Sequence, residues 1–270
     1  MRVYLMTDME GVAGVLASTD WAGPGDRYYE TARELTTLET NAAIEGFLAA
    51  GATEFLVADG HGWGALDPLR LHPAAKLLAG RGIGYPFGAD RGFDVACQIG
   101  QHAKANADGG HLAHTGSFTV EDLTVNGRSL GEMGLNMLFC AYYQIPTILV
   151  CGDQAGADEA RDLVPTIEAV AVKEGLRRGP AAGCTGPQAT AYNACAVHLH
   201  PTVARDRIRT GAERALRRWQ SIPPFWLDPP YVLRRVMRPE TPGGPRAVLE
   251  ARADDLLQLL TAPLQRVQDL

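Results

Sequence analysis

Short apolar segments that stop abruptly at polar residues constrain the fold of this chain more than any other feature. Residues 2–6, Arg-Val-Tyr-Leu-Met, are followed at once by Thr7-Asp8-Met9-Glu10-Gly11. The same break follows three further apolar segments, at residues 54–58, 95–99 and 147–151. Runs of this length, rich in β-branched and aromatic side chains, are typical of buried strands. Because residues 29–50 have the apolar spacing of a helix, the order predicts strand–helix–strand units and a mainly parallel sheet.

The remaining segments extend this pattern into two predicted domains. We expect residues 1–155 to form a three-layer α/β domain and residues 156–270 a smaller α+β domain, with an approximate boundary near residue 155. In the first domain, Asn126-Gly127 indicates a hairpin, and a helix is expected from Gly131 to about Tyr143. In the second, we expect helices at 156–163, 187–199, 202–219 and 254–260, and strands at 169–172, 231–236 and 247–251.

The composition describes a globular chain that can bury a sizeable core. Of its 270 residues, 46% are apolar, yet no stretch has the length of a bilayer-spanning helix or the pattern of a signal peptide. We therefore expect a cytoplasmic protein without a membrane partner. The net charge is −6, and residues 1–155 hold 18 acids against 9 bases. This excess argues against a nucleic-acid partner and weakly favours cation binding.

Motifs of several other enzyme classes are absent from the sequence. It contains no G-x-S-x-G, H-E-x-x-H or P-loop pattern, and no G-x-G-x-x-G at the first turn, so serine-hydrolase, zincin and nucleotide-binding functions lose their usual support. Ser117 follows His114 closely, but no neighbouring residue would order it as a nucleophile. The five cysteines show no C-x-x-C spacing, which predicts reduced core residues.

Acidic and histidine side chains recur where the predicted strands end. In a parallel sheet these ends share one edge, and ligands bind there. Asp8 and Glu10 point the same way in an extended segment, and a proton, a cation or a metal would relieve their crowding. With His61, His102 and Glu132 they give three carboxylates and two imidazoles, a donor set that suits zinc. Two zinc ions would lower the pKa of a bridging water, which would then attack the substrate.

Each of these residues also has an ordinary structural explanation. Asp8 could cap a turn beside a solvated Glu10, His61 could cap a glycine-rich turn, and His102 could be a satisfied half-buried histidine. Glu132 could interact with the N-terminus of its own helix. The recurrence of such residues directly after apolar strands favours the metal site. The other histidines without this placement are expected to be structural: His72, His198 and His200.

Several short segments together resemble a known family. They are Asp8-Met9-Glu10-Gly11, Asp59-Gly60-His61, Leu71-His72-Pro73, Gly100-Gln101-His102-Ala103, Ala113-His114-Thr115, Gly131-Glu132-Met133-Gly134-Leu135-Asn136 and Val150-Cys151-Gly152-Asp153. Over about its first 180 residues the chain resembles the zinc-dependent D-aminopeptidases of the dipeptide-transport (DppA) type. It departs from them at Gln101, where the family has an aromatic residue, at Gly60, where it has serine, and throughout its Pro- and Arg-rich last 90 residues.

The resemblance implies a specific site and assembly. Two zinc ions would be bridged by Asp8, with Glu10 and His102 completing one site, His61 and Glu132 completing the other, and His114 as the catalytic histidine. The family's histidine is called a nucleophile, whereas chemistry alone favours a general base or an oxyanion donor. The family also implies a homo-oligomer, a decamer of two stacked five-membered rings, which releases N-terminal D-residues from short peptides.

We therefore expect a binuclear zinc aminopeptidase that acts on short peptides or amides and prefers D-residues. One alternative is an amidase or peptidase of the same fold that cleaves another small amide, such as a cell-wall peptide fragment. A second is a non-catalytic peptide-binding protein whose metal site serves folding. His114 argues against the second alternative, because a purely structural site has no need of a spare histidine beside its ligands.

Overall fold

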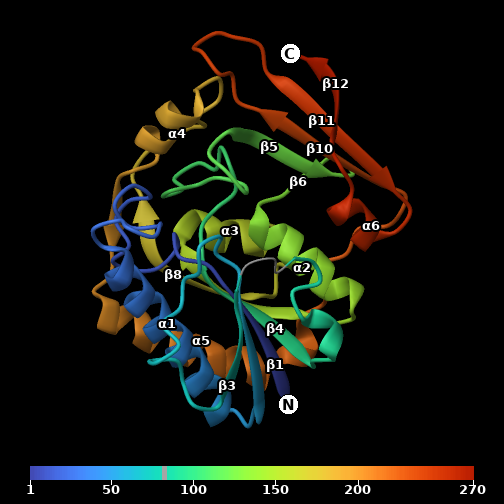
Figure 1. Cartoon of the computed structure of the whole chain (residues 1–270). Coiled ribbons are helices and arrows are strands. Elements are labelled where there is room, and N and C mark those ends of the chain that lie inside the picture. Colours follow the sequence, from blue (N-terminus) through green and yellow to red (C-terminus); the bar gives the residue numbers. More distant parts are fainter. Residues whose placement is uncertain (81–83) are drawn as a thin grey trace.

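A mainly parallel sheet forms the centre of the molecule, as the apolar segments predict (Figure 1). This computed structural model describes residues 1–80 and 84–270, and within them the sheet has seven strands in the order β3-β2-β1-β4-β7-β8-β9. Neighbouring strands are parallel except β8 and β9. The strands are β1 (Arg2–Thr7), β2 (Glu54–Asp59), β3 (Ala75–Leu78), β4 (Val95–Gln101), β7 (Thr147–Asp153), β8 (Glu168–Gly175) and β9 (Ala196–His198).

Helices flank this sheet and complete a three-layer arrangement. The long helices α1 (Tyr29–Ala49) and α5 (Pro201–Arg217) pack against each other, with α1 against β4 and α5 against β7 and β8. The crossover helices α2 (Glu132–Tyr142) and α3 (Gln154–Leu163) link β4, β7 and β8 in turn, and right-handed crossovers place them on the opposite face from α1. Two short helices follow, α4 (Gly186–Tyr192) and α6 (Leu256–Thr261), with 3₁₀ turns at Ala89–Arg91 and Trp219–Ser221.

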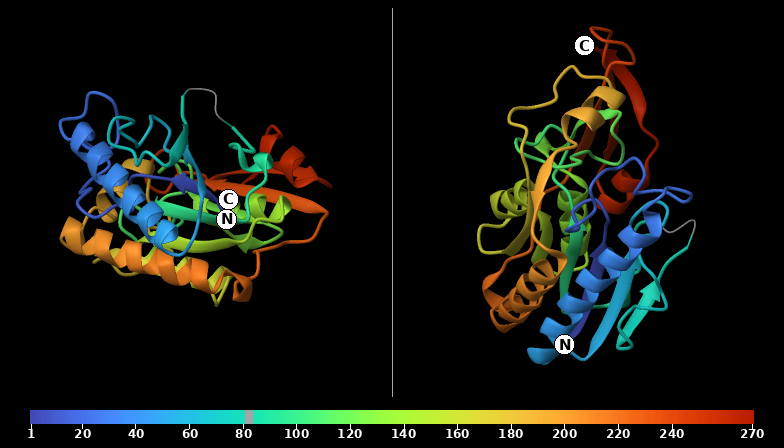
Figure 2. Two further views of the ribbon diagram at one scale, coloured as in Figure 1. Left: turned by 90° about the horizontal axis from the view of Figure 1, so that it is seen from below. Right: turned by 90° about the vertical axis from the view of Figure 1, so that its left-hand side faces the viewer.

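A second, antiparallel sheet lies beyond the carboxyl ends of the parallel strands (Figure 1). Its order is β12 (Gln265–Asp269), β11 (Ala247–Ala253), β10 (Tyr231–Met237), β5 (Val120–Val125) and β6 (Arg128–Ser129). The right-hand view of Figure 2 shows it at the end of the molecule opposite the N-terminus. Each sheet contains strands from both sides of residue 155, and the division into domains 1–155 and 156–270 stays a prediction.

The core is continuous across these layers. Strands β4 and β7 are buried at every residue, so their uninterrupted apolar sequences reflect cover on both faces. Tyr4 of β1 and Phe139 of α2 meet edge to face with ring centroids 6.5 Å apart, and both are fully buried. A rigid core of this kind fixes where the strands end, and therefore where the polar residues after them lie.

Several local expectations are borne out and others are wrong. The hairpin at Asn126-Gly127 joins β5 to β6, and both residues have positive φ (51° and 78°), as a type I′ turn requires. The helix expected at 187–199 ends at Tyr192, because Ala196–His198 pairs with β8 instead. All five cysteines are free, but Cys184 is only partly buried and Cys195 is exposed rather than in the core. Among the described residues, no helix has both the length and the apolar character needed to cross a membrane.

Candidate metal centre

Six side chains from four places in the sequence converge at the carboxyl edge of the parallel sheet. Their potential ligand atoms form two groups, each with all its atoms within 4.8 Å of one another. One group follows β1 and β2: Asp8, Glu10 and His61. The other comes from the segment after β4 and from the start of α2: His102, His114 and Glu132. The structure thus brings together every site residue that the sequence singled out, while their roles as ligands stay predictions.

Two glycines allow the loops after β1 and β4 to come this close. Gly100 has a φ of +74°, and a Cβ there would lie 2.1 Å from the carbonyl oxygen of Asp8. A Cβ on Gly11 would lie 2.1 Å from the carbonyl oxygen of Gln101. The Gly11 amide instead donates to the Gly100 carbonyl at 2.8 Å, and the Asp8 amide donates to the Ile99 carbonyl at 2.9 Å. Any larger side chain would push Asp8 away from the β4 residues beside it.

The first group carries two buried carboxylates beside one imidazole. His61 Nε2 lies 3.5 Å from Glu10 Oε1, and the side chains of Asp8 and Glu10 are nearly inaccessible. Burial and the neighbouring charge of Glu10 raise the pKa of Asp8 to about 7. Burial would lower the pKa of His61, but its pairing with Glu10 prevails and raises that pKa to about 9. This pocket therefore attracts positive charge, whether a proton or a metal ion.

His102 connects the two groups. Its Nε2 lies 3.3 Å from Asp8 Oδ2 and 3.5 Å from Glu132 Oε1, and its ring is fully buried. Its Nδ1 is 2.9 Å from the carbonyl oxygen of Ala103, so Nδ1 carries the proton and donates it to that oxygen. The lone pair of Nε2 then faces the two carboxylates, as in histidines that bind metals.

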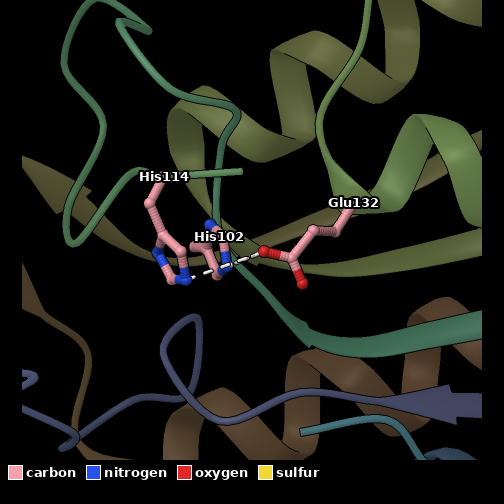
Figure 3. A group of neighbouring side chains, drawn as sticks. All are labelled: His102, His114 and Glu132. Atoms are coloured by element: carbon pink, nitrogen blue, oxygen red, sulfur yellow. Dashed lines mark ion pairs between the residues drawn. The ribbon is translucent and has the colours of Figure 1, made fainter. Parts of the chain in front are cut away.

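The imidazole ring of His114 stacks on the ring of His102. Figure 3 shows the two rings beside each other, with Glu132 pointing toward them from the start of α2. The ring centroids of His102 and His114 are 4.0 Å apart, and Phe118 stacks on the far side of His114 at 4.5 Å. His114 Nδ1 donates to the Leu112 carbonyl at 2.8 Å, which leaves Nε2 free, 3.6 Å from Glu132 Oε1. Burial, and then the charge of His102, lowers the pKa of His114.

The donor atoms of this centre fit a metal ion. Among residues 1–80 and 84–270, four of its buried side-chain atoms have no hydrogen-bond partner: Asp8 Oδ2, Glu10 Oε2, His61 Nδ1 and His102 Nε2. Buried polar atoms without partners are costly and rare in native proteins. Carboxylate oxygens and imidazole nitrogens are the donors that zinc takes in catalytic sites. A divalent ion among them would satisfy atoms that the protein alone does not.

The contacts group these residues differently from the resemblance. The resemblance paired Glu10 with His102 and His61 with Glu132, whereas the structure pairs Glu10 with His61 and His102 with Glu132. Asp8 belongs to the group of Glu10 and His61 and contacts His102 of the other group, so the two groups meet at the contact between Asp8 and His102. The sequence could not reveal these pairings, because they depend on how the loops after β1 and β4 cross.

Sequence reasoning missed one buried side chain that supports the centre. Lys173 of β8 is almost completely buried, and its Nζ donates to the carbonyls of Glu10 and Val15. Its sequence signals were a lysine at the end of an apolar strand and the segment Ala171-Val172-Lys173, which resembles the family only faintly. The histidines that we expected to be structural form hydrogen bonds with backbone amides instead of joining the centre: His72 with Ala74, His198 with Gly14 and His200 with Thr202.

Two cavities adjoin the centre. The smaller, of about 100 Å³, is lined by Asp8 and Glu132 together with the apolar side chains of Tyr85, Phe87 and Leu135. The larger, of about 430 Å³, lies beside His61. Concave spaces that combine apolar walls with a few charged groups are where small ligands bind. A substrate in the smaller cavity would contact residues of both ligand groups.

An α/β fold that brings carboxylates and imidazoles together at its strand ends is typical of hydrolases that use a bound metal ion. Comparison with known proteins places the chain more narrowly. The peptidase M55 family model, described as D-aminopeptidase, matches residues 1–241, and the chain belongs to this family. Membership of this family confirms the expectation that the protein is an enzyme that hydrolyses peptide bonds.

Two relatives illustrate the similarity. A D-aminopeptidase of Bacillus subtilis (strain 168) is 36% identical over 190 residues, which are 69% of this chain and 68% of the relative. A solved structure, the Zn-dependent D-aminopeptidase DppA from Bacillus subtilis, called a self-compartmentalizing protease, superposes with a TM-score of 0.84. It is 27% identical, and the match covers 97% of this chain and 95% of that one. These names describe a peptidase and say nothing of dipeptide transport.

Proposed function

We propose that this chain is a zinc aminopeptidase that holds two ions and releases N-terminal D-amino acids from short peptides or amides. The observation that carries the proposal is a set of four buried ligand atoms that have no hydrogen-bond partner within residues 1–80 and 84–270; they belong to Asp8, Glu10, His61 and His102. Membership of the D-aminopeptidase family supports the reaction, and the zinc dependence of the similar DppA supports the metal.

We assign the ligands from the contacts rather than from the resemblance. One ion would be held by Asp8, Glu10 and His61, and the other by Asp8, His102 and Glu132, with Asp8 as the bridge. The 3.5 Å separation of His61 from Glu10, and the 3.3 and 3.5 Å separations of His102 from Asp8 and Glu132, support this division. A bridging carboxylate is a usual feature of two-metal sites.

The chain's own residues would orient the substrate and move protons. Bound zinc would polarise the scissile carbonyl and lower the pKa of a water toward neutrality. His114 would act at Nε2, because its Nδ1 proton is held by the Leu112 carbonyl. Since its pKa lies below the ordinary histidine value, His114 is neutral at pH 7 and can take a proton and later return it to the leaving amine. The cavity beside Asp8 and Glu132 would hold the N-terminal residue.

We further propose that the active form is a homo-oligomer, a decamer of two stacked five-membered rings. The support is the similarity along 97% of the chain to a protease called self-compartmentalizing. A closed assembly would restrict entry to short peptides, which agrees with an exopeptidase. Sedimentation velocity on the purified protein tests this directly, and a monomeric active enzyme would contradict it.

A substrate panel tests the reaction. The protein is stripped with a chelator, reloaded with zinc, and assayed with matched pairs of D- and L-alanyl amides and dipeptides. We expect turnover of the D-compounds that depends on zinc and a much slower rate on the L-compounds. The Asp8→Ala variant, purified in the same way, controls for contaminating peptidases. Absence of turnover on every D-compound would overturn the proposal.

A further inference from the structure

A buried ammonium group holds both ends of the loop that carries Glu10. This loop, residues 10–15, follows β1, and Lys173 reaches it from β8. Lys173 Nζ donates to the carbonyl of Glu10 at the start of the loop and, at 3.3 Å, to the carbonyl of Val15 at its end. Lys173 is only 3% exposed. Because hydrogen bonds that involve a charged group are strong, and a buried charge without them is costly, these contacts fix the loop against β8.

The peptide group that follows Glu10 is held at both of its ends. Its carbonyl accepts a hydrogen bond from Lys173 Nζ. Its N–H, which belongs to Gly11, donates to the Gly100 carbonyl of β4 at 2.8 Å. Strands β8 and β4 therefore fix this planar unit from two sides. The Cα of Glu10 is part of the same plane, so the direction in which the Glu10 carboxylate leaves the backbone depends on Lys173 as well as on β4.

Asp8, the other carboxylate of this ligand group, is held in a different way. Its amide donates to the Ile99 carbonyl of β4 at 2.9 Å, and its Oδ1 accepts from the Met9 amide at 2.9 Å. Within residues 1–80 and 84–270, the side-chain hydrogen bonds of Lys173 do not reach Asp8. Loss of the Lys173 contacts should therefore displace Glu10 and leave Asp8 in position.

Two further side chains hold the middle of the same loop. The Ala13 amide donates to Glu39 Oε1 of α1 at 2.9 Å. The Gly14 amide donates to His198 Nδ1 of β9 at 3.1 Å. The partners of these amides lie 26 and 184 residues away in the sequence, so tertiary contacts rather than local sequence set the shape of the loop. Lys173 is the anchor that contacts Glu10 itself.

We propose that Lys173 is a positioning residue, which sets the affinity of the zinc ion assigned to Asp8, Glu10 and His61 by holding Glu10 in place. This inference rests on the proposed function, in which that ion is one of two. The sign of the effect separates positioning from charge. An ammonium group near a cation repels it, so removal of the charge alone would tighten zinc binding. Removal of the hydrogen bonds that orient a ligand weakens metal binding instead.

The test measures zinc affinity, which requires no turnover. Lys173→Met keeps an unbranched apolar side chain and removes the ammonium group. Each protein is shown to be folded by circular dichroism and is then titrated with zinc in competition with a chromogenic chelator. We expect one of the two binding steps to weaken by about 10- to 100-fold and the other to change by less than about 3-fold. His198→Leu removes the acceptor of the Gly14 amide at a half-buried position, and it should weaken the same step by about 3- to 5-fold even if the lysine variant does not fold.

A double-variant cycle shows whether Lys173 acts through Glu10. Glu10→Gln weakens the binding step to which Glu10 contributes, and in that background Lys173→Met should weaken the step further by less than about 3-fold. Arg238→Met is the matched control. Arg238 is also a buried cation, but its guanidinium donates to the Ala181 carbonyl and the Asn106 side chain. Its loss should lower the free energy of unfolding and leave both zinc affinities unchanged.

Three results would overturn the positioning role. They are tighter zinc binding in Lys173→Met, equal weakening of both binding steps, and full additivity of Lys173→Met with Glu10→Gln. Unchanged zinc affinity in both Lys173→Met and His198→Leu would do the same. A wild type that binds two ions but turns over no D-peptide would refute the aminopeptidase function alone, because the zinc affinities are measured without turnover.

Discussion

Replacing His114 with glutamine separates two roles that the structure allows for this side chain. Its Nε2 lies 3.6 Å from Glu132 Oε1, and its ring belongs to one of the two groups of potential metal ligands. It could therefore hold a metal or move a proton. We predict the second role, because His61, His102 and three carboxylates already provide enough donors for two ions.

The structure sets the expected size of the effect. His114 Nδ1 is held by the Leu112 carbonyl at 2.8 Å, so only Nε2 can exchange a proton with substrate. Burial and the charge of His102 keep its pKa low, and the neutral ring can act as a base at pH 7. Removal of a positioned acid–base group costs about 10²- to 10⁴-fold in kcat, or roughly 3–5 kcal/mol of transition-state stabilisation. Loss of the stacking on His102 and Phe118 adds only about 1 kcal/mol of destabilisation.

The assay measures turnover and zinc on the same sample. We expect His114→Gln to lose at least about 100-fold in kcat on a D-aminoacyl amide while it retains the full wild-type zinc content. His72→Gln is the control, since the His72 side chain accepts a hydrogen bond from the nearby Ala74 amide, away from the centre, and its loss should change neither quantity. Unchanged turnover in His114→Gln would refute the proton-transfer role, and loss of one zinc per chain would show that His114 is a ligand.

Three further substitutions probe the centre and its support. Asp8→Ala should lose both ions by elemental analysis, because we assign Asp8 to both; loss of one ion only would refute the bridge. Gly100→Ala should destabilise by about 1–3 kcal/mol in urea denaturation and weaken zinc binding, since its φ is +74° and a Cβ would meet the Asp8 carbonyl. Glu39 is fully buried, and burial raises its pKa to about 7. Because the folded-state pKa of Glu39 exceeds its unfolded-state pKa, the contribution of Glu39 to the free energy of unfolding is complete below pH 4.5. This contribution falls by about 3 kcal/mol as the pH rises through 7. Glu39→Gln should flatten that fall, and equal pH slopes in variant and wild type would contradict it.

The fold was predictable where local sequence carries the signal. Strands β1, β2, β4 and β7 are apolar runs that end at glycine or charged residues, and each lies where the sequence placed it. Strand β12 was missed, because all five of its residues are exposed and only pairing with β11 makes it a strand. The prediction of a helix that continues to residue 199 was wrong for the same reason. Pairing with β8 overrides the helical spacing after Asn193.

The sequence predicted which candidate residues lie together, but not how they are arranged. Asp8, Glu10, His61 and His102 follow strands directly, and the shared edge of a parallel sheet brings such residues together. Which imidazole faces which carboxylate depends on the crossing of two loops and on the backbone carbonyl that holds each ring. The supporting position of Lys173 was not predicted, because a buried charge is recognisable only once its surroundings are known.

Zinc content tests the central claim most directly. The purified wild-type chain is reloaded with zinc, freed of unbound metal by gel filtration, and measured by plasma mass spectrometry against protein concentration from amino-acid analysis. The arrangement of Asp8 between the groups of Glu10 with His61 and His102 with Glu132 predicts two zinc ions per chain. One ion per chain, or none, would contradict it.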